Sequence, residues 1–90
     1  MNTEQFESII DQLNIIKPYC ISWGCGNEFG GYGEERHIEG LEHPVTPLIC
    51  DRNVFGVVYY GTVYYRTDDL NALNIAELYA RQSYCKLQQM

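Results

Sequence analysis

The stretch from residue 54 to residue 67 constrains the fold more than any other part of the chain. It reads Val-Phe-Gly-Val-Val-Tyr-Tyr-Gly-Thr-Val-Tyr-Tyr-Arg-Thr and is rich in the β-branched and aromatic residues that strands favour. The run is much longer than the usual strand of about 5–6 residues. We therefore predict a β-hairpin that turns at Gly61-Thr62, where glycine supplies the positive φ of a type II′ turn. A single bent strand with bulges at Gly56 and Gly61 is the alternative.

The register of this hairpin decides which tyrosines are buried. Alternate residues of a strand point to opposite faces of the sheet, and paired residues share a face. A turn at Gly61-Thr62 therefore places Val58, Tyr60, Val63 and Tyr65 on one face. The other face carries Val57, Tyr59, Tyr64 and Arg66. One tyrosine of each Tyr-Tyr pair is thus predicted to pack inside, and the other to face outward.

Two amphipathic helices are expected at the ends of the chain. The first spans residues 2–16, where Asn2 and Gln5 fit a capping box. Its apolar stripe is Phe6, Ile9, Ile10, Leu13 and Ile16. The second spans residues 68 to about 87 after Thr67 as N-cap, with a stripe of Leu70, Leu73, Ala76, Ala80 and Tyr84. Further apolar residues lie outside this second stripe, so the helix is either apolar on two sides or broken near Asn74.

The middle of the chain predicts two short strands around a long loop. Tyr19–Cys25 has the alternation of a strand. Residues 44–50 predict an edge strand or an extended lead-in, because Pro47 cannot donate to a ladder. Residues 26–43 hold five of the eight glycines and five of the twelve acidic residues, with room for a short strand near Arg36. We predict one compact α+β domain over residues 1–90. Its small, mainly antiparallel sheet of three to four strands has both helices packed on one face.

The charge of the chain limits its partners. Twelve acidic and six basic residues give a formal net charge of −6. Direct nucleic-acid binding requires a basic surface, and anionic membranes attract basic segments, so we expect neither partner. A protein with a basic surface, such as one that itself binds nucleic acid, fits better. Solubility alone is the alternative reason for the acidity.

The N-terminal residues lack the basic and apolar regions of a signal peptide. We therefore expect a cytoplasmic protein whose four cysteines remain reduced.

The metal-ligand candidates are spaced more loosely than the Cys-x2-Cys pairs of common zinc sites. They are Cys20, Cys25, His37 and Cys50. No pattern typical of a nucleophile, a phosphate loop or an acid–base pair stands out, so we predict no enzyme and no cofactor.

Aromatic rings beside acidic side chains predict a protein-binding surface. Tyrosine and arginine are enriched at interface hot spots, and recognition often lies on loops. The candidate partner-binding residues come from the acidic loop and the outer face of the hairpin. They are Glu28, Tyr32, Glu34, Glu35, Glu39, Tyr59, Tyr64 and Arg66.

In size, acidity and aromatic content the chain is similar to small inhibitory proteins such as antitoxins, immunity proteins and phage-encoded blockers of host defence. No matched motif accompanies this likeness, so no functional residue is transferred. We predict a non-enzymatic protein that occludes a basic surface of a protein partner. The acidic side chains would steer the encounter and the tyrosines would supply most of the affinity. The alternative is a small-ligand or zinc-binding regulatory domain that forms a homodimer.

Overall fold

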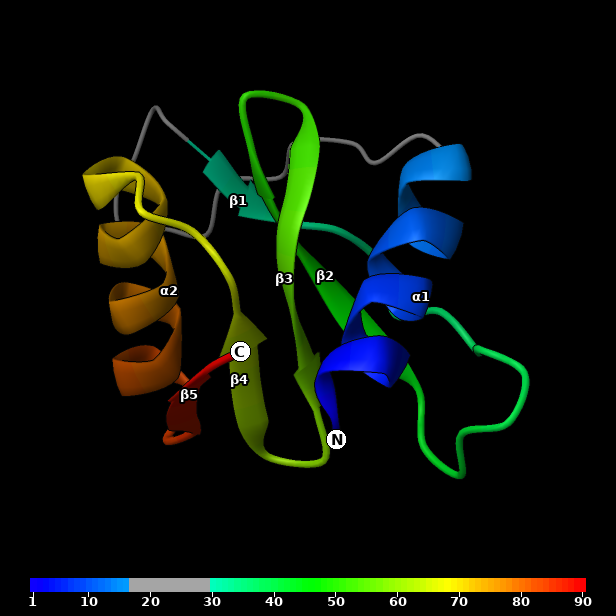
Figure 1. Cartoon of the computed structure of the whole chain (residues 1–90). Coiled ribbons are helices and arrows are strands. Elements are labelled where there is room, and N and C mark those ends of the chain that lie inside the picture. Colours follow the sequence, from blue (N-terminus) through cyan, green and yellow to red (C-terminus); the bar gives the residue numbers. More distant parts are fainter. Residues whose placement is uncertain (17–29) are drawn as a thin grey trace.

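The computed structural model describes residues 1–16 and 30–90. The elements in chain order are α1 (Thr3–Ile15), β1 (Gly30–Tyr32), β2 (Val45–Cys50), β3 (Asn53–Tyr59), β4 (Thr62–Tyr65), α2 (Leu70–Gln82) and β5 (Lys86–Gln89). The five strands form one sheet in the order β1-β2-β3-β4-β5 (Figure 1). Neighbours from β1 to β4 are antiparallel, and β5 runs parallel to β4. The expected strand Tyr19–Cys25 lies outside the described residues.

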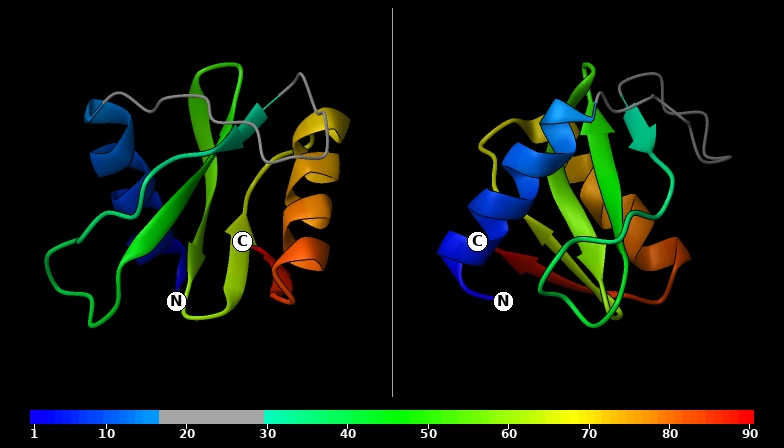
Figure 2. Two further views of the ribbon diagram at one scale, coloured as in Figure 1. Left: turned by 180° about the vertical axis from the view of Figure 1, so that it is seen from behind. Right: turned by 90° about the vertical axis from the view of Figure 1, so that its right-hand side faces the viewer.

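The two helices cover opposite faces of the sheet, as the views from the front, the back and the side show (Figures 1 and 2). Phe6, Ile9 and Leu13 of α1 pack with Ile49 and other residues on one face. The buried side of α2 packs on the other face with a second set that includes Leu48. The α+β class is confirmed, but the expected placement of both helices on one face is wrong.

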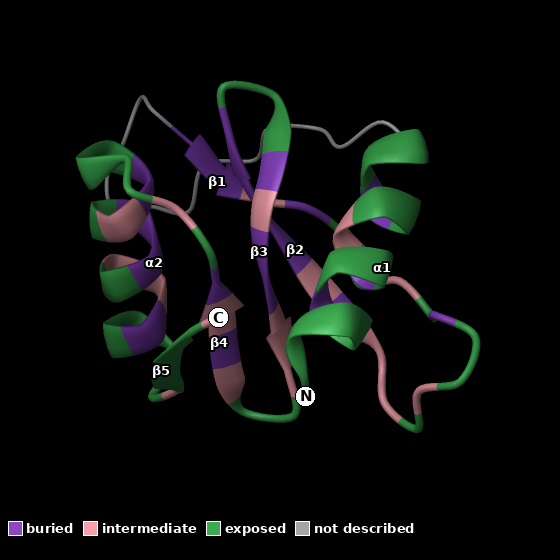
Figure 3. Ribbon diagram, in the orientation of Figure 1, coloured by how far each residue is buried: buried purple, intermediate pink, exposed green. Residues whose placement is uncertain are grey.

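The burial of β2 gives the physical reason for this arrangement. Leu48, Ile49 and Cys50 are consecutive and all buried, and most of β2 is purple in Figure 3. Consecutive strand residues point to opposite faces, so a strand with such a run needs a cover on each side. Apolar runs of this kind are typical of strands buried on both faces.

The hairpin of β3 and β4 turns one residue earlier than predicted. Tyr59 pairs with Thr62, and the two central residues, Tyr60 and Gly61, have φ values of 46° and 79°. Positive φ at both positions defines a type I′ turn rather than type II′. The pairing differs from the predicted one by two residues, so the side chains that share a face are the predicted ones. Tyr60 is the exception, because it lies in the turn and is 75% exposed. The expectation that the face with Val57, Tyr59 and Tyr64 points outward is wrong, because α1 covers it: Val57 is fully buried and the two tyrosines are half-buried.

Pro47 lies inside the sheet, although the sequence predicted an edge strand. β2 pairs with β1 on one side and with β3 on the other. The Pro47 carbonyl accepts the N–H of Gly33, just past the last β1 residue. A Cβ on Gly33 would lie 2.8 Å from the proline ring. The backbone N–H that Pro47 lacks would therefore lie beyond the last β1 pair, where no strand needs it. Gly33 leaves room there for the proline ring.

The N-terminal helix begins as the sequence predicts. The Asn2 side chain accepts from the Gln5 N–H at 2.8 Å, and the Gln5 side chain accepts from the Asn2 N–H, which completes the capping box. Near the end of the helix, the Asn14 side chain accepts from the Val54 N–H at 3.1 Å, across 40 residues of sequence. This bond fastens α1 to β3 next to a bulge in the β2–β3 register.

The C-terminal helix is shorter than predicted. Asp69, rather than Thr67, caps it by accepting from the Asn71 N–H at 2.8 Å. The helix ends at Gln82, and residues 86–89 form β5 instead of a last helical turn. Leu70 and Tyr84 of the predicted stripe are exposed, whereas Ile75, which lay outside that stripe, is fully buried.

Candidate functional site

A groove runs between α1 and the loop that precedes β2, and we call it the acidic groove. It encloses about 410 Å³ and is lined by Glu4, Gln5, Ser8, Ile9 and Gln12 of α1 and by Ile38, Glu39, Gly40 and Leu41 of the loop. The loop side is a tight turn in which the Leu41 N–H donates to the Ile38 carbonyl at 3.1 Å. Gly40 has a φ of 91°, which the third position of a type II turn requires.

The acidic groove combines an apolar floor with a charged rim. Ile9 and Ile38 are almost completely buried beneath it. Glu4 and Glu39 are exposed at its sides. Within the described residues, neither carboxylate takes part in an ion pair. The groove therefore offers two uncompensated negative charges over a hydrophobic base.

The other flank of α1 has a different character. Glu7 and Asp11 line a second groove of about 350 Å³ together with Arg66. Arg66 forms an ion pair with Glu7. The acidic residues of α1 thus serve two grooves, because Glu4 lines the acidic groove while Glu7 is neutralised by Arg66 in the second one.

The structure disperses the residues predicted to bind a partner. Glu39 lines the acidic groove, and Glu34 and Glu35 are exposed on the segment between β1 and the groove. Glu28 lies outside the described residues. Tyr59 and Tyr64 are half-buried against the α1-side cluster.

Tyr32 lies on the opposite face of the sheet from Tyr59 and Tyr64. Its ring meets the ring of Tyr79 edge-on, with 5.6 Å between the centroids. Glu4 was not among the predicted partner-binding residues, although it lines the same groove as Glu39. The long separation of the two residues along the chain concealed their common groove.

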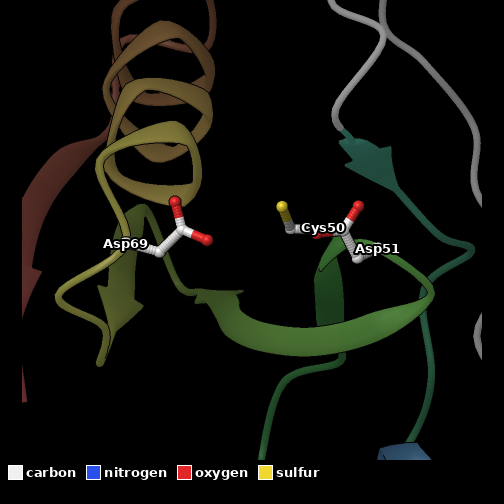
Figure 4. A group of neighbouring side chains, drawn as sticks. All are labelled: Cys50, Asp51 and Asp69. Carbon is white, nitrogen blue, oxygen red and sulfur yellow. The ribbon is translucent and has the colours of Figure 1, made fainter.

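Three potential metal ligands meet where β2 ends and α2 begins. Ligand atoms of Cys50, Asp51 and Asp69 all lie within 4.8 Å of one another. Figure 4 shows the Asp69 carboxylate directed toward Cys50 and Asp51. The ligands of one tetrahedral zinc are about 3.5 Å apart, so the cluster has to close only slightly to hold such an ion. Asp51 and Asp69 were not predicted as ligands, because only the fold brings them to Cys50.

The remaining metal candidates do not join this cluster. Cys20 and Cys25 lie outside the described residues, and His37 is exposed on the loop before the acidic groove. His43 has a different contact, since its ring stacks on Tyr60 with 4.3 Å between the centroids and 8° between the planes. This stack places an imidazole at the tip of the β3–β4 hairpin.

Two side chains on the α2 side have perturbed acidities. Burial raises the pKa of the Tyr79 phenol above its ordinary value, against the lowering effect of a hydrogen bond with Ser83. Burial also raises the pKa of the Cys85 thiol. A raised pKa reduces the thiolate fraction at neutral pH, so it argues against Cys85 as a nucleophile.

Neither described helix combines the length and the apolar character that crossing a bilayer requires. Two candidate sites lie within the described residues, the acidic groove and the Cys50–Asp51–Asp69 cluster. No protein-family model, curated protein or solved structure matches this chain.

Proposed function

We propose that the chain is a non-enzymatic binding protein whose acidic groove receives a basic side chain of a protein partner and thereby occludes the partner's basic surface. One observation carries the proposal. Glu4 of α1 and Glu39 of the loop flank the same groove, and neither is in an ion pair within the described residues.

An arginine side chain suits this groove chemically. Its aliphatic stem packs on apolar surface while its charged end stays at the rim, and Ile9 and Ile38 supply that apolar floor. The planar guanidinium donates several hydrogen bonds to carboxylates, which Glu4 and Glu39 provide. Lysine has the same charge but a single donor centre, so we expect it to bind more weakly.

The rest of the surface assists the encounter. A net charge of −6 attracts a basic partner over a range that salt shortens. Tyr59 and Tyr64 are proposed to add aromatic contact area beside α1. A cytoplasmic antitoxin, immunity protein or phage blocker of host defence would use such a surface to cover the basic working surface of its target.

The test is a titration followed by backbone amide NMR shifts. The ligand is a short arginine-rich peptide, and the matched ligand carries citrulline, the neutral isostere, at each arginine. We expect shifts centred on Glu4, Ser8 and residues 38–41 with the first peptide only. Shifts spread evenly over all acidic residues would contradict a defined site.

Paired variants sharpen the test. Glu39→Gln removes a groove carboxylate and is expected to weaken peptide binding by about three- to tenfold, in line with the loss of one partly exposed charge pair. Glu42→Gln removes another exposed charge of the same loop, which does not line the groove. Equal effects of the two variants would show that only net charge matters.

Metal-dependent regulation is the second candidate function, and the Cys50–Asp51–Asp69 cluster is the observation that favours it. A thiolate and two carboxylates are suitable zinc ligands, and a fourth position would remain for water or a ligand. Metal analysis of protein purified without a histidine tag tests this candidate. Stoichiometric zinc that is lost in Asp51→Asn but kept in Asp68→Asn would support it, whereas absence of zinc after incubation with the ion would exclude it.

A further inference from the structure

The last strand of the sheet has an open outer edge. β5 pairs with β4, and within the described residues no strand pairs with its other side (Figure 1). All four β5 residues are exposed. Proteins usually blunt such edges with proline, bulges or several charges, but Lys86 is the only charged residue of β5 and the strand contains no proline.

The hydrogen bonds to β4 show which backbone groups face outward. The Lys86 N–H donates to Gly61 at 3.0 Å, and the Met90 N–H donates to Tyr65 at 2.7 Å. Because successive residues of a strand direct their backbone groups to alternate sides, Leu87 and Gln89 present theirs to the outer edge. A further strand could bind there without disturbing the pairing with β4.

We propose that this edge pairs with the same edge of a second copy of the chain, in an antiparallel arrangement centred on Leu87. In that register the two Leu87 residues exchange their outward N–H and carbonyl groups across the two-fold axis. Lys86 then lies opposite the partner's Gln88, so no like charges face each other. The Leu87 side chain, which is 39% exposed, meets the partner's Leu87.

Charge favours this edge over the rest of the surface as the place where two copies meet. Two molecules of net charge −6 repel each other over most of their surfaces. β5 contains no acidic residue, and the last turn of the preceding helix carries Arg81. This edge is therefore a place where two copies can meet without opposing carboxylates, and it centres on a self-complementary apolar pair.

The dimer is expected to be weak. A pair of four-residue strands buries less than the roughly 1,200 Å² of a standard interface. We therefore propose sedimentation equilibrium over a series from about 1 μM to about 1 mM, which spans the affinities of weak complexes. The wild-type mass is expected to rise with concentration toward twice the 10.4 kDa of one chain.

Two substitutions of Leu87 test the interface. Leu87→Lys places like charges opposite each other at the two-fold axis, and it should raise the dissociation constant by about tenfold or more. Leu87→Pro removes an outward N–H that β4 does not use, so it should abolish the dimer and leave the β4–β5 pairing intact. Leu70→Lys is the matched control, since Leu70 is equally apolar and 68% exposed but begins α2 at a distance from β5.

Amide hydrogen exchange of the wild-type chain gives a readout that no variant can confound by misfolding. At high concentration the Leu87 and Gln89 amides should be protected, and dilution should release them while the Lys86 and Met90 amides stay protected. A single-chain mass at about 1 mM, concentration-independent exchange at Leu87, or a dimer that Leu87→Lys leaves unchanged would each overturn the proposal. A dimer that Leu70→Lys dissociates equally would overturn it as well.

Discussion

Two tyrosines occupy backbone conformations that glycine normally fills. Tyr60 has a φ of 46° in the β3–β4 turn, and Tyr84 has a φ of 54° just after α2. The left-handed region costs an L-residue roughly 1–2 kcal/mol. Tyr60 offsets part of this cost by stacking on His43, whereas the Tyr84 side chain is 97% exposed.

Tyr84→Gly is therefore expected to stabilise the protein. Tyr84 follows the helix cap, and the next N–H, from Cys85, donates to Ala80 at 2.8 Å. Glycine is the preferred residue at this position of the C-terminal cap, so we expect a gain of about 0.5–1 kcal/mol in the free energy of unfolding. Urea denaturation at one fixed low protein concentration measures it.

Tyr60→Gly provides the comparison at the same scale. It relieves a similar backbone strain but gives up the aromatic stack with His43, which is worth about 0.5–1.5 kcal/mol. We expect a smaller gain than for Tyr84→Gly, or none. A larger gain from Tyr60→Gly would show that the stack contributes nothing.

Tyr79 of α2 contacts Tyr32 of β1 through a partly buried phenol ring. Burial raises the Tyr79 pKa above its ordinary value of 10.0, so the fold prefers the neutral ring. The unfolded chain loses this proton near pH 10.0, and the folded chain loses it only at higher pH. Stability is therefore lost as the pH rises through that interval.

Tyr79→Phe has no phenol to ionise and should lose less stability in alkali. The measurement is the difference in melting temperature between this variant and the wild type from about pH 8 to about pH 11.5. Tyr84→Phe removes an exposed phenol and serves as the matched control. If the difference for Tyr79→Phe stays constant over the whole range, burial of Tyr79 does not couple to stability.

At the scale of elements, the sequence was most informative where a pattern had one interpretation. Asn2 and Gln5 specified the start of α1. Strict alternation placed Tyr59 and Tyr64 on one face even though the turn was displaced, but it could not show that α1 covers this face. β5 could not be predicted, because Lys-Leu-Gln-Gln has neither alternation nor apolar bias and all four residues are exposed. Its place in the sheet depends on pairing with β4, which is a tertiary contact.

At the scale of the whole molecule, the sheet is covered on both faces, so neighbouring residues of β2 pack in different hydrophobic clusters. Leu48 and Ile49 are both fully buried, one toward α2 and one toward α1. Each truncation to alanine is expected to cost about 2–5 kcal/mol, a large fraction of the total stability of a small domain. Urea denaturation of Leu48→Ala and Ile49→Ala measures this.

Thr46→Ala, at a partly exposed position of the same strand, should change stability by less than about 1 kcal/mol. If Ile49→Ala lowers the free energy of unfolding as little as this control, α1 does not cover that face of the sheet. The sequence alone could not decide this point. The apolar residues 48–50 are typical of a strand buried on both faces. The sequence does not show which helix packs on which face, because that depends on the path of the chain around the sheet.

The locations of the acidic groove and of the Cys50–Asp51–Asp69 cluster could not be predicted from the sequence either. Net charge and residue types were available from the sequence, and Glu39 was selected on that basis. Its partnership with Glu4, and that of Asp69 with Cys50, arises only when distant segments are brought together. The sequence therefore predicts which chemical groups a surface carries better than it predicts where on the molecule they gather.

The bond between the Asn14 side chain and the Val54 N–H also bears on the order in which the protein folds. β2, β3 and β4 are joined by two-residue turns, so their pairing closes short loops and can form early. The docking of α1 spans 40 residues and has to await the strand that receives it. We expect substitutions on the buried side of α1 to accelerate unfolding while leaving the refolding rate nearly unchanged.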